Sequence, residues 1–384
     1  MTGATRKPTT PKTAAWWTGN LAKPEAHPAG DDGRKARRFF AVLLAIMAAI
    51  GGWVYWGQRT RAQAAEAVLA LGGRVANSTS EGMFLGPVDL AGRPVGDAEL
   101  ARLGPLFAAA KGPLRLDLSR TQVTDAGLAA LAPLTYLAGL KLDGTAIAGA
   151  GLAALARMGT DTHAEFGTPV ELSLAGTAVG DDALGHLAAI GGLTDLDLSG
   201  TRVTGRGLAA LRGLRYLKHL ELNGCGIGDG DLAGLQGIYF LGLARTRVTA
   251  AGLGGVRQVR TLDLAGTAVD DAGMAVFAEF SELTGLSLAE TAVGDAGLLE
   301  LRRQERLVSL NLDGTGVNDE SLRALAGWVS LRSLSLEQTA VTDRGLGYLA
   351  GLPNLDRLLL RGAKFTEAGV AALQKLRPNL LIDR

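Results

Sequence analysis

Apolar residues recur at a fixed spacing along most of the chain. From about residue 85 to the C-terminus the pattern L-x-x-L-x-L-x-x-T-x-V-x-D-x-G-L-x-x-L returns repeatedly, and residues 193–211 (LTDLDLSGTRVTGRGLAAL) are a clean copy. Self-similarity at such a period is typical of stacked structural units. The residue three places after each L-x-L segment marks twelve units, mostly 24 residues apart. These marks are Arg93, Thr121, Thr145, Thr177, Thr201, Cys225, Thr246, Thr267, Thr291, Thr315, Thr339 and Ala363.

Each unit predicts one strand and one short helix. The two leucines of L-x-L face the same side of a strand, so they enter the core while the residue between them faces solvent. The later leucines predict a helix that packs on the back of the sheet. The pairs Thr124 with Asp125 and Thr342 with Asp343 are expected to cap the first amides of such helices. The predicted fold is therefore an α/β solenoid, a horseshoe with a parallel sheet on the concave face and helices on the convex face.

These motifs resemble the cysteine-containing subfamily of leucine-rich-repeat proteins. Residues 217–235 (LKHLELNGCGIGDGDLAGL) match its L-x-x-L-x-L-x-G-C-x-x-I-x-D-x-x-L pattern, with a small departure at residues 230–231. Elsewhere Thr replaces Cys, as in similar bacterial membrane-anchored repeat proteins. The resemblance covers about residues 85–384 and implies the fold, but it names no ligand. It implies a buried structural ladder made of Thr121, Thr145, Thr177, Thr201, Cys225, Thr246, Thr267, Thr291, Thr315 and Thr339.

Three irregularities interrupt the period. One spacing is 32 residues, which places eight extra residues within 159–169. The two spacings after Cys225 are 21 residues each, which shortens the convex side of those units. The first spacing, from Arg93, is 28 residues and indicates an imperfect first unit.

An apolar run precedes the repeats. Residues 39–56 (FFAVLLAIMAAIGGWVYW) carry no charge, and as a helix they would span roughly 27 Å, close to the thickness of a bilayer core. A cleaved signal peptide, a buried core helix and a permanent anchor are the three interpretations. The length of the run, its aromatic end and its lack of a polar face favour a single transmembrane helix.

Charge sets the predicted orientation. The whole chain has 39 basic and 38 acidic residues, which excludes a strongly basic nucleic-acid binder. Residues 1–38 hold eight basic and three acidic side chains, a net charge of +5, so the remainder carries about −4. Since basic residues are more frequent before the apolar run than after it, we expect a cytoplasmic N-terminus and extracytoplasmic repeats, periplasmic or at the cell surface.

These observations divide the chain into five segments. No single repeat covers its own apolar face, so both ends of the array need caps. The segments are a disordered basic tail (1–38), the transmembrane helix (39–56), an N-terminal helical cap and linker (57–84), the repeat array (85–369) and a C-terminal cap (370–384).

The concave face carries the candidate site. Its outward residues form a surface roughly 50 Å long, and the middle of that surface is acidic. It reads either as a binding patch for a basic or amine-bearing partner or as an ordinary solvated strand surface. The candidate binding residues are Glu171, Asp195, Asp197, His219, Glu221, Tyr239, Phe240 and Asp263.

No catalytic motif accompanies these residues. The sequence has no H-E-x-x-H, no G-x-S-x-G and no phosphate-binding loop, so we predict no catalytic residue, metal site or cofactor. The predicted function is a membrane-anchored scaffold that recognises a protein or a cell-envelope polymer. One alternative is a substrate-recognition adaptor of a ubiquitin ligase, which would need an F-box-like module before the repeats. Another is a metal-assisted hydrolase that uses the acidic patch.

Overall fold

The computed structural model describes residues 32–76, 84–161, 167–301 and 303–384. They fall into two units, which meet between Tyr55 and Trp56. Helix α1 (Asp32–Ala70) supplies residues to both units. The disorder predicted for the N-terminal tail falls almost entirely on residues outside the described ones.

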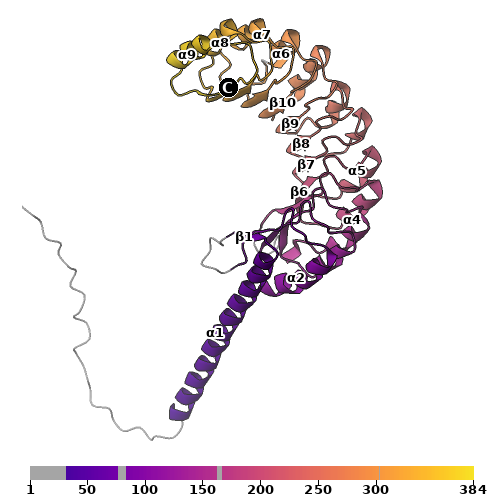
Figure 1. Ribbon diagram of the computed structural model, residues 1–384, viewed down its shortest axis with the longest axis vertical. Coiled ribbons are helices and arrows are strands. Elements are labelled where there is room, and N and C mark those ends of the chain that lie inside the picture. The colour runs from indigo at the N-terminus through magenta and orange to yellow at the C-terminus, as the bar shows by residue number, and fades with distance from the viewer. Residues whose placement is uncertain (1–31, 77–83, 162–166, 302) are drawn as a thin grey trace, which may run out of the picture. The chain divides into compact units, whose positions relative to one another are not determined.

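Residues 56–384 form a curved stack in which the strands line the inner side and the helices lie on the outer side (Figure 1). The strands of the described residues make one sheet in chain order, with β1 antiparallel to β2 and every later pair parallel. The predicted parallel sheet backed by helices is therefore confirmed. The strands are β1 (Arg74–Val75), β2 (Val88–Asp89), β3 (Leu114–Asp117), β4 (Leu137–Lys141), β5 (Val170–Ser173), β6 (Leu193–Asp197), β7 (His219–Glu221), β8 (Phe240–Gly242), β9 (Thr261–Asp263), β10 (Gly285–Ser287), β11 (Ser309–Asn311), β12 (Ser333–Ser335), β13 (Arg357–Leu359) and β14 (Leu381–Asp383).

The outer elements are short, and several are 3₁₀ helices. Five of these 3₁₀ helices have three to six residues, a length that completes few α-helical hydrogen bonds, whereas η6 has nine. Helix α2, with 14 residues, is longer than the other outer helices and fills the 28-residue first spacing. The outer elements are α2 (Asp97–Ala110), η1 (Gly127–Leu131), η2 (Ala150–Leu155), η3 (Asp181–Ala183), α4 (Leu184–Leu187), α5 (Gly205–Leu211), η4 (Asp229–Asp231), η5 (Ala250–Gly255), η6 (Asp271–Glu279), α6 (Asp295–Leu301), α7 (Asp319–Leu325), α8 (Asp343–Leu349) and α9 (Glu367–Leu376).

The core is a column of aliphatic side chains with fixed register. Leu220 pairs with Leu241 and Leu241 pairs with Leu262, and all three are fully buried. Burial of one such side chain contributes about 2 kcal/mol to the free energy of folding. The strands of the two 21-residue units pair with their neighbours in the same register as the other strands. These units are therefore shorter on the outer side of the stack and not in the strand. Register is also kept across the 32-residue spacing, where Gly139 pairs with Glu171.

A second column lies beside the leucines. Each threonine of the structural ladder is buried and donates its hydroxyl to the carbonyl three residues earlier, at 2.5–2.7 Å. Cys225 differs, because its Sγ donates to the Leu198 carbonyl of the preceding repeat at 3.0 Å. That carbonyl also accepts the Thr201 hydroxyl at 2.6 Å. Burial raises the pKa of the Cys225 thiol, so the thiol is held protonated.

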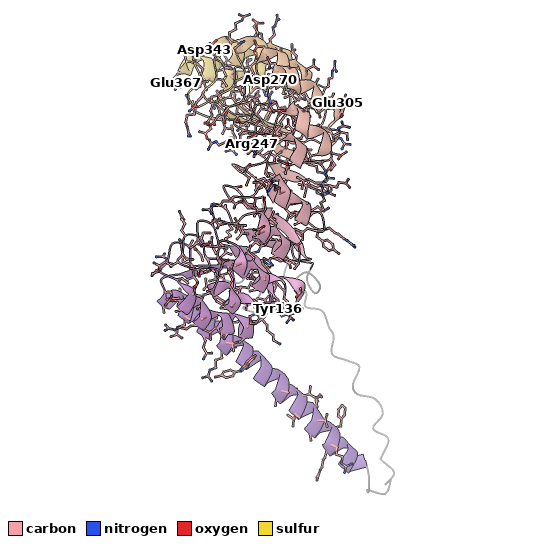
Figure 2. The ribbon with its side chains drawn as sticks, turned by 90° about the vertical axis from the view of Figure 1, so that its right-hand side faces the viewer. Tyr136, Arg247, Asp270, Glu305, Asp343 and Glu367 are labelled. Atoms are coloured by element: carbon pink, nitrogen blue, oxygen red, sulfur yellow. The ribbon has the colours of Figure 1, made fainter. Side chains whose placement is uncertain are left out.

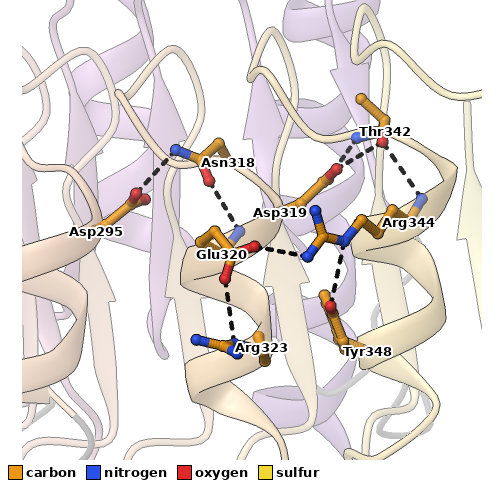
Figure 3. Close-up of polar contacts among 8 residues, drawn as sticks. All are labelled: Asp295, Asn318, Asp319, Glu320, Arg323, Thr342, Arg344 and Tyr348. Carbon is orange, nitrogen blue, oxygen red and sulfur yellow. Dashed lines mark hydrogen bonds and ion pairs between the residues drawn. The ribbon is translucent and has the colours of Figure 1, made fainter.

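The outer side carries a column of hydrogen bonds between repeats, here called the carboxylate ladder (Figure 3). Asp319 accepts from both the amide and the hydroxyl of Thr342 in the next repeat, at 2.8 and 2.6 Å. Thr342 in turn caps its own helix by accepting from the Arg344 amide at 3.3 Å. The ladder recurs at Asp97 with Thr124, Asp181 with Thr204, Asp229 with Thr249 and Asp343 with Thr366.

The carboxylate ladder corrects one detail of the sequence analysis. We expected Asp125 and Asp343 to cap their own helices, but both accept hydrogen bonds from the next repeat. The threonine already occupies the capping position, so the carboxylate of the aspartate is free to accept hydrogen bonds from the next repeat.

Asp343 lies towards the C-terminal end of the stack and Tyr136 lies towards its other end (Figure 2).

The ladder also explains the glycine of the D-x-G-L motif. A Cβ added at Gly345 would lie 2.3 Å from Oδ1 of Asp319, and one added at Gly127 would lie 2.3 Å from Oδ1 of Asp97. Real Cβ atoms do not approach an oxygen so closely, so the glycine is needed to admit the carboxylate of the neighbouring repeat.

The ends of the array are covered by different elements. Ala64 and Val68 at the end of α1 are fully buried and start the core. At the other end α9 buries Val370 and Leu373, and β14 adds a strand beyond the twelve units that the sequence marks. Among the residues that the structure describes, no helix has an apolar stretch long enough to cross a membrane. The transmembrane helix predicted over residues 39–56 is thus not supported by the structure, although α1 covers them.

Substitution of Gly345 by alanine should destabilise the array by about 1–3 kcal/mol, because the new methyl group collides with Asp319. Gly347 lies in the same helix with no heavy atom within 4 Å of its added Cβ, so Gly347→Ala should stabilise the array by about 0.5–1 kcal/mol. Urea unfolding of both variants measures the difference. Equal effects of the two substitutions would contradict the role given to the glycine.

Candidate concave binding site

The concave side of β2 to β7 is hollowed by a depression of about 620 Å³, here called the acidic hollow. Seven carboxylates and three cationic side chains line it, so its net charge is −4 when the histidine is protonated. The carboxylates are Asp89, Asp117, Asp143, Glu171, Asp195, Asp197 and Glu221, and the cations are Arg115, Lys141 and His219.

His219 lies at one end of the acidic hollow between two carboxylates. Its Nδ1 is 3.3 Å from Oδ1 of Asp195 and its Nε2 is 3.4 Å from Oε1 of Glu221. The ring packs on Phe240, with centroids 4.0 Å apart and planes inclined by 36°. Adjacent parallel strands place these residues side by side, because Asp195 pairs with His219 and His219 pairs with Phe240.

The carboxylates fix the charge of this histidine. Hydrogen bonding to Asp195, and then to Glu221, raises the pKa of His219 to about 9. In return, His219 and the Thr194 hydroxyl, which is 2.6 Å from Oδ2 of Asp195, hold the pKa of Asp195 below its ordinary value. At neutral pH the imidazolium has a proton on both nitrogens, so it has no lone pair for a metal ion or for general-base catalysis.

A second ion pair crosses the hollow over a glycine. Arg115 on β3 reaches Glu171 on β5, and Gly139 on the intervening strand β4 leaves the space for it. A Cβ at Gly139 would lie 3.1 Å from Cγ of Arg115. Both side chains remain partly exposed, so the pair contributes little to stability but neutralises one carboxylate of the hollow.

Several aspartates of the concave face also have a local structural role. Oδ1 of Asp117, Asp197 and Asp263 each accepts from the backbone amide two residues on, at 2.9, 2.8 and 3.0 Å. Asn311 makes the same bond at 2.9 Å in a later repeat. The acidic residues at this position therefore close the turn after each strand, and an amide side chain does so equally well.

The candidate residues do not all meet. The acidic hollow contains Glu171, Asp195, Asp197, His219 and Glu221. Phe240 and Asp263 line a separate shallow depression over β8 to β11. Tyr239 lines neither, and lies just before β8 between Lys218 and Arg260, with Nζ and Cζ at 4.9 and 4.6 Å from its ring centroid.

The acidic hollow begins nearer the N-terminal end of the array than the candidate residues do. The hollow extends over β2 to β4, whose charged residues share the repeat positions used to select the others. Asp143 lies in the turn after β4, at a position where most other repeats carry Ala, Ser or Asn, so it was not selected as a candidate. The residues missed are Asp89, Arg115, Asp117, Lys141 and Asp143. Within the described part of the chain, no group of three or more His, Cys, Asp and Glu side chains could hold a metal ion.

Replacing Asp195 by asparagine should lower the pKa of His219 from about 9 towards 6.5, because the largest cause of the shift is removed. A raised pKa stabilises the fold fully below pH 6.5, and this contribution is lost as the pH rises through about 9. The Asp195→Asn variant should therefore lose less stability than the parent between these pH values. NMR titration of the histidine Cε1 protons and urea unfolding at several pH values measure both effects. Asp182→Asn, in η3 on the outer side, is the control, and an unmoved His219 titration would refute the assignment.

Comparison with known proteins gives a family but no close relative. No curated protein matches the chain in sequence. A Listeria monocytogenes internalin has 19% identity and a TM-score of 0.49, covering 73% of this chain and 87% of that chain. A leucine-rich-repeat protein of Leptospira interrogans has 17% identity and a TM-score of 0.49, covering 74% of each chain. Internalin C2 of Listeria monocytogenes has 24% identity and a TM-score of 0.40, covering 57% of this chain and 84% of that chain.

The assignment rests on the repeats themselves. The signature of the leucine-rich-repeat family matches residues 114–132, 193–211 and 213–235. The first of these segments covers β3 and η1, the second covers β6 and α5, and the third contains β7 and η4. Each match therefore coincides with one strand and its outer helix. The chain is a leucine-rich-repeat protein.

Proposed function

We propose that the chain is a protein-interaction scaffold whose acidic hollow binds a basic segment of a partner protein. The observation that carries the proposal is the uncompensated charge of the hollow, which keeps a net charge of −4 although Arg115, Lys141 and His219 are already inside it. Repeat proteins of this kind commonly bind partners on the extended concave surface that the stack creates.

The dimensions of the hollow suit an extended peptide. Six strands span five steps of about 4.8 Å, so the hollow is roughly 24 Å long, the length of about seven extended residues. Lys or Arg side chains of such a peptide would pair with carboxylates that also close the turns after the strands, such as Asp117 and Asp197. The ring of Phe240, stacked on His219, ends the hollow with an apolar surface. A cell-envelope polymer that bears amines would pair with the same carboxylates of the acidic hollow.

Three substitutions test this proposal without disturbing the turns. Asn311 shows that an amide closes the same turn, so Asp89→Asn, Asp117→Asn and Asp197→Asn together remove three charges and retain the fold. Affinity of the full chain for a labelled lysine-rich peptide should fall about tenfold, as expected for the loss of three exposed ion pairs. Fluorescence anisotropy at low and high salt measures the change.

The matched control is Asp263→Asn, which changes the same repeat position outside the acidic hollow. It should leave the affinity within about twofold. Unchanged binding by the triple variant would eliminate the hollow as the peptide site. Crosslinking in the native cell, followed by identification of the attached protein, would then name the partner of the parent chain.

We also propose that residues 39–56 attach the chain to a membrane and that the repeats lie outside the cytoplasm. The support is the absence of charge over these eighteen residues and the exposure of apolar side chains along α1. Phe39, Leu44 and Met47 are 67%, 65% and 62% exposed, and water solvates such side chains poorly.

Fractionation tests the attachment. The full chain should stay in the membrane pellet after an alkaline carbonate wash, and Leu44→Lys with Met47→Lys should release it into the supernatant. Release of the parent chain by carbonate would overturn the attachment. For the orientation, protease added to intact cells should digest the repeats, whereas protection of the repeats would place them in the cytoplasm.

A further inference from the structure

The edge of the sheet at which the strands begin carries a cluster of opposite charge to the acidic hollow. Lys218, Tyr239 and Arg260 stand immediately before β7, β8 and β9, and we call these three residues the tyrosine patch. The Lys218 ammonium and the Arg260 guanidinium lie 4.9 and 4.6 Å from the centroid of the Tyr239 ring. One exposed aromatic ring therefore contacts two cations.

The backbone holds the three side chains together. The Tyr239 amide donates to the Lys218 carbonyl at 2.7 Å, and the Arg260 amide donates to the Tyr239 carbonyl at 2.8 Å. The Lys218 ammonium also donates to the Gly237 carbonyl at 3.1 Å. Because both cations contact the same ring, their charges lie less than about 10 Å apart, a separation at which they repel each other at low ionic strength, where the Debye length is about 30 Å.

Cations further along this edge are neutralised. Arg306 pairs with Glu282 at 2.7 Å, and Arg332 pairs with Asp356 at 2.9 Å. Within the described residues, neither cation of the tyrosine patch has a carboxylate at ion-pair distance. The tyrosine patch therefore carries unpaired positive charge across three successive repeats.

We propose that the tyrosine patch binds an acidic segment of a protein partner, with carboxylates paired to Lys218 and Arg260 against the ring of Tyr239. An anion between the two cations removes their repulsion, and an exposed tyrosine beside arginine is a common anchor at protein interfaces. Tyr239 is 42% exposed, so the ring is accessible to a partner.

The surroundings favour a short acidic peptide over larger polyanions. Nucleic acid and anionic membranes need an extended basic surface. Here the next cations towards the C-terminal end of the edge, Arg306 and Arg332, are already paired, and the adjacent concave face is acidic. An extended polyanion would meet repulsion there, whereas a few aspartate or glutamate side chains fit within the patch. This surface does not depend on the acidic hollow.

Peptide binding by the full chain tests the proposal. The probe is a fluorescein-labelled peptide of alternating Glu and Gly, measured by anisotropy at low salt. Lys218→Gln with Arg260→Gln should weaken its binding about tenfold, as expected when two charge-assisted contacts are lost. The matched control is Arg306→Gln with Arg332→Gln, which removes two paired cations from the same edge and should change the affinity less than twofold.

The outcomes separate the alternatives. Equal losses in the two double variants would show a general field effect and overturn the tyrosine patch, as would no binding by the parent chain. Tighter binding of a single-stranded oligonucleotide or of phosphatidylserine vesicles than of the peptide would overturn the choice of partner. The lysine-rich peptide should bind the Lys218→Gln, Arg260→Gln variant with the affinity of the parent chain. A failure of the acidic hollow to bind that peptide is therefore distinguished from a failure of the tyrosine patch to bind the acidic peptide.

Discussion

The hydrogen bond from the start of an outer element to an aspartate of the preceding repeat is the interaction on which the array depends, and in five of these contacts the donor is a threonine. In the pair Asp319 and Thr342, one carboxylate accepts both the amide and the hydroxyl of the next unit. The amide would otherwise be unpaired at the start of a helix. The bond fixes the distance between successive outer elements while the sheet fixes the inner strands. Two columns of hydrogen bonds, one on each side of the leucines, therefore determine how each unit stacks on the last.

This stacking decides which surface is available for binding. The outer aspartates are engaged with neighbouring repeats, whereas the inner residues face solvent on a rigid sheet. The charge repulsion that such a sheet suffers is reduced in three ways: by the protonated His219, by Arg115 crossing over Gly139, and by turn-closing bonds of the aspartates. The carboxylates that remain make the concave face over β2 to β7 negatively charged. The edge beside it is positively charged at Tyr239, where Lys218 and Arg260 lie.

Local pattern was enough to predict the strands, because each L-x-L segment pairs with the same segment one unit later. It could not predict contacts that need the next unit's position. Asp343 meets Thr366 and Gly369 only after stacking, so the sequence suggested a cap on its own helix. Tyr239 was expected on the concave face as a neighbour of Phe240. It precedes the first residue of β8, and it lies among edge cations instead. The attachment of residues 39–56 to a membrane stays a prediction.

The position of Cys225 gives the array a built-in reporter. It is the chain's one cysteine, and it is buried in the middle of the stack with its Sγ bonded to the Leu198 carbonyl of the preceding repeat. A thiol reagent can reach it only when these central repeats separate, since the protonated, buried thiol is unreactive. The rate of labelling therefore measures local opening at the centre of the solenoid, independently of fraying at either end, and needs no engineered probe.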